Sequence, residues 1–139
     1  MAAWRVGDAK RLGAIAHPEL MRRCRTARIV EFYVEGKDDK KKALAAGSDA
    51  NALALFCEAL RAIVPRDERF DHFDRFVEVR RKNDLVIVVF ESGVKRKSDQ
   101  KIIQSSSTEV VLKQVGNEWR FLWSIAAQIH IDLDWDPRT

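Results

Sequence analysis

The sequence predicts an α+β domain: N-terminal helices and one long amphipathic helix packed on a curved antiparallel β-sheet. Two observations support this prediction. Residues 53–64 carry apolar side chains at helical spacing, and β-rich runs separated by turns follow from Phe76 to Leu133. Apolar positions that recur every three or four residues indicate an amphipathic helix, whereas short β-branched or aromatic runs bounded by turns indicate strands. Helices followed by a run of strands are typical of an α+β domain.

The length and composition limit the domain organisation. A chain of 139 residues with 46% hydrophobic content is expected to form a single domain, residues 1–139. The longest apolar run, Leu85–Phe90, is far shorter than the roughly 20 residues that cross a bilayer, so no membrane insertion is expected. The charged N-terminus lacks the apolar core of a secretory signal, and we therefore expect a cytoplasmic protein.

The N-terminal part is predicted to contain two short helices and a strand. Residues 8–16 can form a helix, and Pro18 suits the first turn of a second helix because its missing N–H is not needed there. The β-branched and aromatic run from Ile29 to Val34 then predicts a strand over Arg28–Glu35, with a continued helix as the alternative.

The central helix is the strongest structural prediction. Ser48 or Asp49 is expected to cap it, and Pro65 stops it after Val64 because proline breaks the helical hydrogen-bond pattern. Its apolar stripe comprises Leu53, Phe56, Cys57, Leu60, Ile63 and Val64.

The second half of the chain is predicted to form an antiparallel meander. A first strand around Phe76–Val79 is followed by a turn at residues 82–84 and by Leu85–Phe90, which we expect to be buried on both faces. Residues 93–107 form either a long hairpin arm or a mobile loop. The meander then continues through strands at Thr108–Val115, at Trp119–Ile125 after the Gly116-Asn117 turn, and at Ala127–Leu133.

Three of these segments resemble parts of the nuclear transport factor 2-like (SnoaL-like, ketosteroid-isomerase-like) cone fold. Asp49–Val64 followed by proline looks like the third helix of that family. Phe76–Phe90 resembles its strand–turn–strand unit, and Glu109–Ser124, with tryptophan after a Gly-Asn turn, resembles its penultimate hairpin. The resemblance covers roughly residues 28–133. It implies a cone that pairs into a homodimer through the sheet face, but it implies no single activity, because this fold hosts enzymes and non-catalytic modules alike.

Enzymes of this family place an acid/base pair in the open end of the cone, and the resemblance directs attention to three candidate catalytic residues. These are Tyr33, the only tyrosine, His130 and Asp132. In the strand predicted for residues 127–133, Gln128, His130 and Asp132 share one face. They form a polar floor if that face points into the cone, and they are solvated if it points outward. His72 is expected in a charged turn at the surface.

The aromatic side chains suggest a ligand pocket or a core wall. Trp119 and Trp123 are expected on one face of a strand, and together with Phe56 and Gln128 they could line a pocket for a small apolar ligand. Trp4 and Trp135 lie near the two termini and could pack together or anchor a partner.

Basic residues suggest an alternative role in nucleic-acid binding. The chain has 25 basic and 21 acidic residues, a net charge of +4. Basic groups on a hairpin arm and at the neighbouring turn could form one positive patch that neutralises phosphates. Against this role, no aromatic residues are interleaved with them for base stacking. The residues concerned are Arg80, Arg81, Lys82, Lys95, Arg96 and Lys97.

Other chemistry is not indicated. Cys24 and Cys57 fit buried free thiols in helices, and a disulfide would require the two helices to touch. No metal-ligand spacing, phosphate loop or nucleophile elbow is present, so neither a metal nor a cofactor is expected. The function expected is therefore a small-molecule-binding or protein-assembly module. The alternatives are an isomerase, dehydratase or hydrolase with a polar cavity, and a nucleic-acid-binding protein.

Overall fold

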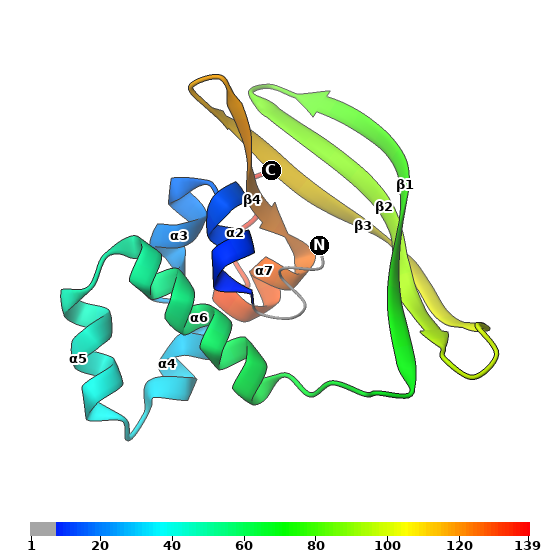
Figure 1. Cartoon of the computed structure of the whole chain (residues 1–139). Helices are drawn as coiled ribbons and strands as arrows, with labels where there is room; N and C mark the ends of the chain where they lie inside the picture. Colours follow the sequence, from blue (N-terminus) through cyan, green and yellow to red (C-terminus); the bar gives the residue numbers. More distant parts are fainter. Residues whose placement is uncertain (1–7) are drawn as a thin grey trace.

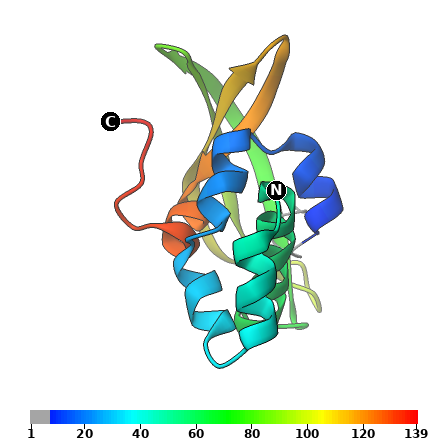
Figure 2. The same ribbon diagram turned by 90° about the vertical axis from the view of Figure 1, so that its left-hand side faces the viewer.

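The computed structural model describes residues 8–139, in which helices precede and follow one antiparallel sheet (Figure 1). The four strands follow one another in the order β1-β2-β3-β4, so β1 and β4 are the two edges. In Figure 2 the helices gather in front of β4 while the rest of the sheet extends behind them. The elements are α2 (Ala9–Ile15), α3 (Pro18–Cys24), α4 (Arg28–Val34), α5 (Asp38–Ala46), α6 (Asp49–Ile63), β1 (Phe70–Lys82), β2 (Leu85–Arg96), β3 (Ile102–Val115), β4 (Glu118–Ser124) and α7 (Ile125–Ile131).

The segment predicted as a strand at Arg28–Glu35 is a helix, α4, so the strand prediction is wrong. The alternative of a continued helix is confirmed only in its helical state, because α3 ends at Cys24 and α4 begins as a separate helix at Arg28. Three β-branched residues of this segment, Ile29, Val30 and Val34, are buried within the helical layer. Intrinsic strand preference amounts to only a fraction of a kcal/mol per residue, and the burial of these side chains outweighs it.

The central helix α6 is confirmed with its expected limits. The Ser48 Oγ accepts a hydrogen bond from the Asn51 N–H, and the helix ends just before Val64 and Pro65. The Arg25 guanidinium, at the end of α3, donates to the carbonyl oxygens of Leu44 and Gly47. It thereby binds α3 to the turn that leads into α6.

The sheet is built from long hairpins. Residues 93–107, which were predicted as either an arm or a loop, form the arm in which the end of β2 pairs with the start of β3. In β2, Leu85, Ile87 and Val89 are buried, while the alternate side chains are only half-buried. The expectation of burial on both faces was therefore wrong, because only one face of this strand is tightly packed.

The last predicted strand, Ala127–Leu133, is also a helix. The Ser124 Oγ accepts a hydrogen bond from the Ala127 N–H and caps α7, which runs from Ile125 to Ile131. In a helix successive residues are about 100° apart, so Gln128 and His130 point in different directions. The polar floor, one of two arrangements that the strand period left open, is therefore wrong.

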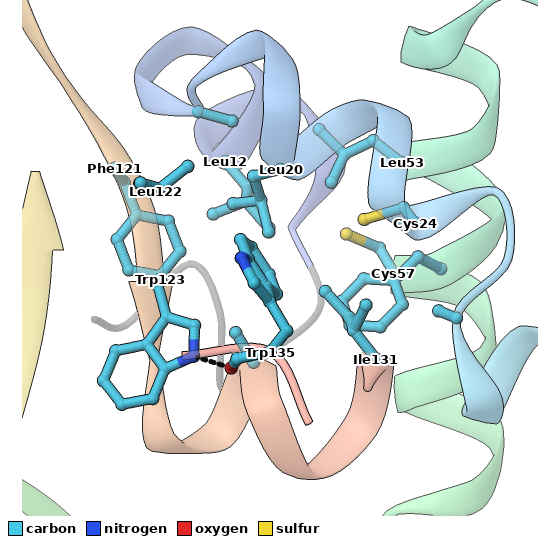
Figure 3. Packing of buried hydrophobic residues seen from close by; sticks show 14 of the residues in the cluster. Leu12, Leu20, Cys24, Leu53, Cys57, Phe121, Leu122, Trp123, Ile131 and Trp135 are labelled. Atoms are coloured by element: carbon cyan, nitrogen blue, oxygen red, sulfur yellow. Dashed lines mark hydrogen bonds between the residues drawn. The ribbon is translucent and has the colours of Figure 1, made fainter. Parts of the chain in front are cut away.

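Large buried side chains from the helices, from β4 and from the C-terminal tail form the core (Figure 3). Trp123 is fully buried, and its indole N–H donates to the Trp135 carbonyl at 2.7 Å. Trp135 is also buried, and Trp4 lies outside the described residues. Cys24 and Cys57 lie next to each other in this core as free thiols (Figure 3), and burial raises the pKa of Cys57 to about 11.

These features confirm an α+β fold, with helices packed on a curved four-stranded antiparallel sheet that does not close. Within residues 8–139, none of the helices has the length and apolar character needed to span a membrane.

Replacing Trp123 with alanine is expected to destabilise the protein by about 3–5 kcal/mol, because it removes a fully buried ring and its hydrogen bond to Trp135. Urea unfolding measures the loss. Trp119→Ala is the matched control, since that ring is 39% exposed, and its cost should stay below about 1 kcal/mol. Equal losses for the two variants would contradict this account of the core.

The His17 side chain is expected to make stability depend on pH. Its Nδ1 accepts the Glu19 N–H at 3.0 Å and caps α3, and burial lowers the pKa of His17. Because the unfolded chain then takes up the proton first, stability should fall as the pH drops through 6.5. His17→Asn keeps a cap that does not titrate, so its urea midpoint should change less between pH 7.5 and pH 5. The stability of His17→Asn should still depend on pH to some extent, because burial also lowers the pKa of His130. An unchanged slope in His17→Asn would rule out this role for His17.

Candidate functional site

Strand pairing sorts the side chains of β1, β2 and β3 onto two faces of the sheet. His72 pairs with Val94, which in turn pairs with Gln104, and Asp74 pairs with Ser92, which in turn pairs with Ser106. Residues directly opposite one another in paired strands point to the same side of the sheet. We call this side the hollow face. The opposite side, which the C-terminal tail covers through contacts from Arg138 to Glu109 and Trp123, is the tail face.

The hollow face contains an open cavity of about 330 Å³ at its junction with α7. Its sheet side is mostly polar and its helix side is apolar. This combination is typical of sites that bind small molecules, in which apolar surface supplies affinity and a few polar groups orient the ligand. The lining residues are His72, Asp74, Ser92, Gly93, Val94, Gln104, Ser106, Thr108, Val110, Ser124, Ile125, Ala126 and Ile129.

A hydrogen bond and a close approach of two strands hold the sheet side of the cavity in place. The Ser92 hydroxyl donates to an Asp74 carboxylate oxygen at 2.6 Å, which joins β1 to β2 on this face. Next to Ser92, Gly93 allows β2 and β3 to approach closely, because a Cβ built there would lie 1.9 Å from the Gln104 carbonyl oxygen. The polar side chains are therefore held on paired strands rather than on a loop.

The first turns of α7 form the apolar wall. Ile125 and Ile129 line the cavity, and both remain substantially exposed to solvent. Because β4 ends at Ser124 and α7 begins immediately, this wall is fixed at the end of the strand that carries the core tryptophan. A ligand resting on the wall would remove apolar surface from water, which favours binding.

Tyr33 does not take part in this cavity. It lies on α4, where its hydroxyl is hydrogen-bonded to Glu58 of α6, and this bond raises the pKa of Tyr33. The Lys40 ammonium also donates to Glu58, at 2.7 Å, and lies over the Tyr33 ring. Tyr33 therefore belongs to a surface cluster that joins α4, α5 and α6.

His130 and Asp132 also lie apart from the cavity lining. Burial, together with the nearby Arg28 guanidinium, lowers the pKa of His130. Asp132 follows the end of α7 and accepts a hydrogen bond from the Asp134 N–H at 2.9 Å. Among residues 8–139, no hydrogen bond joins Tyr33, His130 or Asp132 to one another, so the structure does not assemble the predicted trio.

The predicted pocket residues are dispersed as well. Phe56 and Trp123 are fully buried in the core, whereas Trp119 is exposed at the start of β4. Arg81 lies over the Trp119 ring, 5.3 Å from its centroid. The Gln128 side chain donates to the Leu133 carbonyl and holds the end of α7. None of these side chains lines the cavity.

The two basic clusters lie at opposite ends of the β1–β2 hairpin. Lys95 pairs with Asp71 near one end and Arg80 pairs with Ile87 near the other, a separation of roughly 30 Å along the strands. Acidic neighbours compensate several of these charges: Arg80 meets Glu78 and Glu109, and Arg96 meets Asp99. The arrangement does not form the single positive patch that the sequence suggested.

The cavity was not predicted from the sequence, although a signal for it was present. His72 and Asp74 are separated by one residue, as are Gln104, Ser106 and Thr108. Period-two polar spacing would have placed each set on one strand face. The signal was missed because His72 was expected in a surface turn before the first strand, and because residues 93–107 were left open between a hairpin arm and a loop.

Across residues 8–139, no group of three or more His, Cys, Asp or Glu side chains could hold a metal ion. No family model, curated protein or solved structure matches the chain.

Proposed function

We propose that the chain is a non-catalytic binding module of the nuclear transport factor 2-like type, and that the cavity on the hollow face is its ligand site. The observation that carries the proposal is the pairing of an ordered polar strand surface with the exposed apolar wall of Ile125 and Ile129. The order of the long helix α6, the long hairpins and β4 supports the resemblance to the nuclear transport factor 2-like fold.

The chemistry of the lining indicates the class of ligand. Hydroxyl and amide side chains predominate, and Asp74 supplies a carboxylate, so a neutral hydrogen-bonding group suits the strands better than an anion does. The wall of α7 suits an aromatic or aliphatic body. The expected ligand is therefore a small, uncharged amphipathic molecule.

The catalytic alternative has less support, since it depends on Tyr33, His130 and Asp132 sharing one cavity. The nucleic-acid alternative is weakened by the distance between the basic clusters. The two buried thiols are compatible with a reducing, cytoplasmic setting, which we retain as part of the proposal. The exposed apolar side chains of β1 support self-association of the sheet as a homodimer.

Titration with 2-naphthol, followed by ¹H–¹⁵N NMR, tests the ligand site. The probe combines an aromatic body with a hydroxyl group. The largest shifts are expected at Ser92, Ser106 and Ile125, because all three line the cavity. Shifts scattered over the surface, or none at the cavity, would contradict the proposal.

Ile129→Ser should weaken 2-naphthol binding by about threefold or more, because it removes apolar wall area that the ligand covers. The matched control is Ile103→Ser, since Ile103 has a similar exposure, 45% against 50% for Ile129, and does not line the cavity. Equal weakening by both variants would indicate non-specific adsorption rather than a site.

A further inference from the structure

The outer edge of β1 has no neighbouring strand within residues 8–139, although the strand is 13 residues long. Its side chains are almost all exposed, including Phe76 at 60% and both Val77 and Val79 at 54%. A long edge strand leaves a row of backbone donors and acceptors unpaired, which makes it a template for another strand. Apolar side chains at its middle add surface that pairing would cover.

A β-bulge determines which side chains of β1 share a face. Phe76 pairs with Phe90 and Glu78 pairs with Val89, so Val77 is the extra residue. Beyond the bulge the alternation is therefore shifted by one position. Asp71 and Arg75 share the tail face with Glu78 and Lys82, because all four lie opposite odd-numbered residues of β2.

We infer that β1 pairs antiparallel with β1 of a second copy, about a two-fold axis between Phe76 and Val77. In this register Asp71 lies opposite Lys82 of the second copy, and Arg75 lies opposite its Glu78. Phe76 lies opposite Val77 at the axis. Each contact occurs twice by symmetry, which gives an apolar centre flanked by opposite charges.

The bulge and the charges together select this register. Registers shifted by one residue would pair side chains from opposite faces, which antiparallel pairing does not allow. A shift by two residues in one direction places Arg75 opposite Arg80. A shift by two in the other direction moves the acidic Glu78 opposite Phe73 and places Arg75 opposite Phe76, which points to the other face.

The strength of the contact comes from the backbone rather than from the charges. Arg75 and Glu78 already have partners within the chain, Glu91 and Arg80 respectively. Exposed ion pairs contribute little, so they fix the register while strand hydrogen bonds and the apolar centre supply the affinity. A contact of this size is expected to give a weak dimer, with a dissociation constant on the order of micromolar or higher.

The consequence is one continuous sheet formed from two four-stranded sheets. His72 and Asp74 at the rim of the cavity would then lie beside the second copy's strand, with Val79 opposite Asp74. The inference does not depend on the ligand proposal, because it concerns the edge of the sheet and is tested without a ligand.

Sedimentation of the full chain over a range of concentrations, with the charge-reversal variants Arg75→Glu and Glu78→Arg, tests the pairing. The unmodified chain should dimerise, and each single variant should weaken dimerisation by about tenfold, because it creates two like-charge contacts. The double variant restores opposite charges and should regain dimerisation. Lys101→Glu, at the hairpin turn, is the control and should not change it. A monomer at all concentrations, or a double variant no better than the singles, would overturn the inference.

Disulfide cross-linking tests the register independently of any effect of the reversals on folding. The double variant Asp74→Cys with Val79→Cys should form a covalent dimer under mild oxidation, because the two positions face each other across the axis. They cannot join within one chain, since five strand residues span roughly 16 Å. Asp74→Cys with Arg81→Cys, on the same face of β1, is the out-of-register control and should cross-link much less. Equal cross-linking by both pairs would overturn the proposed register.

Discussion

The structure depends on the burial of β4 between the helical layer and the C-terminal tail. Phe121, Leu122 and Trp123 are all buried although they are consecutive in a strand. The pairing register of β3 with β4 shifts between Val111 and Leu112, so Leu122 falls outside the regular ladder. This irregularity lets one short strand present apolar side chains to partners on more than one side. Within residues 8–139 no other strand is buried so completely.

Hydrogen bonds fix β4 at both flanks. On the helical side, the His17 N–H donates to the Phe121 carbonyl at 2.7 Å, and Ala16 forms a bridge with Phe121. On the other side, Trp123 donates to the Trp135 carbonyl, and the Arg138 guanidinium lies 4.3 Å from the centroid of the Trp123 ring. Asp136 and Glu109 both contact Arg138 and raise its pKa above the ordinary range. Pairing with Arg138 also lowers the pKa of Asp136. The tail is therefore bound to the sheet by a desolvated ring and a charged network together.

This anchoring leaves most of the sheet free for other contacts. Because the helices meet the sheet mainly along β4, the outer strands extend away from the core. One face of these strands carries the cavity beside α7, and β1 offers its edge. The same asymmetry explains why apolar residues such as Phe76 and Val79 are exposed, since no helix in the described part of the chain covers them. Ligand binding and strand pairing would use different parts of this exposed region.

The sequence by itself determined the fold class, the limits of α6 and the hairpin turns, because each is fixed by local signals. Ser48 and Pro65 bound the helix through backbone hydrogen bonding, and Gly116 adopts the positive φ that its turn requires. Only the tertiary structure decided the state of Arg28–Glu35 and Ala127–Leu133. In both segments the β-branched residues favour a strand weakly, and burial against α6 or capping by Ser124 makes them helices. The position of the cavity was likewise decided only by the tertiary structure. The cavity brings together all four strands and α7, and the pairing of its strands depends on the bulges at Val77 and at Val94/Lys95, which no local pattern marks.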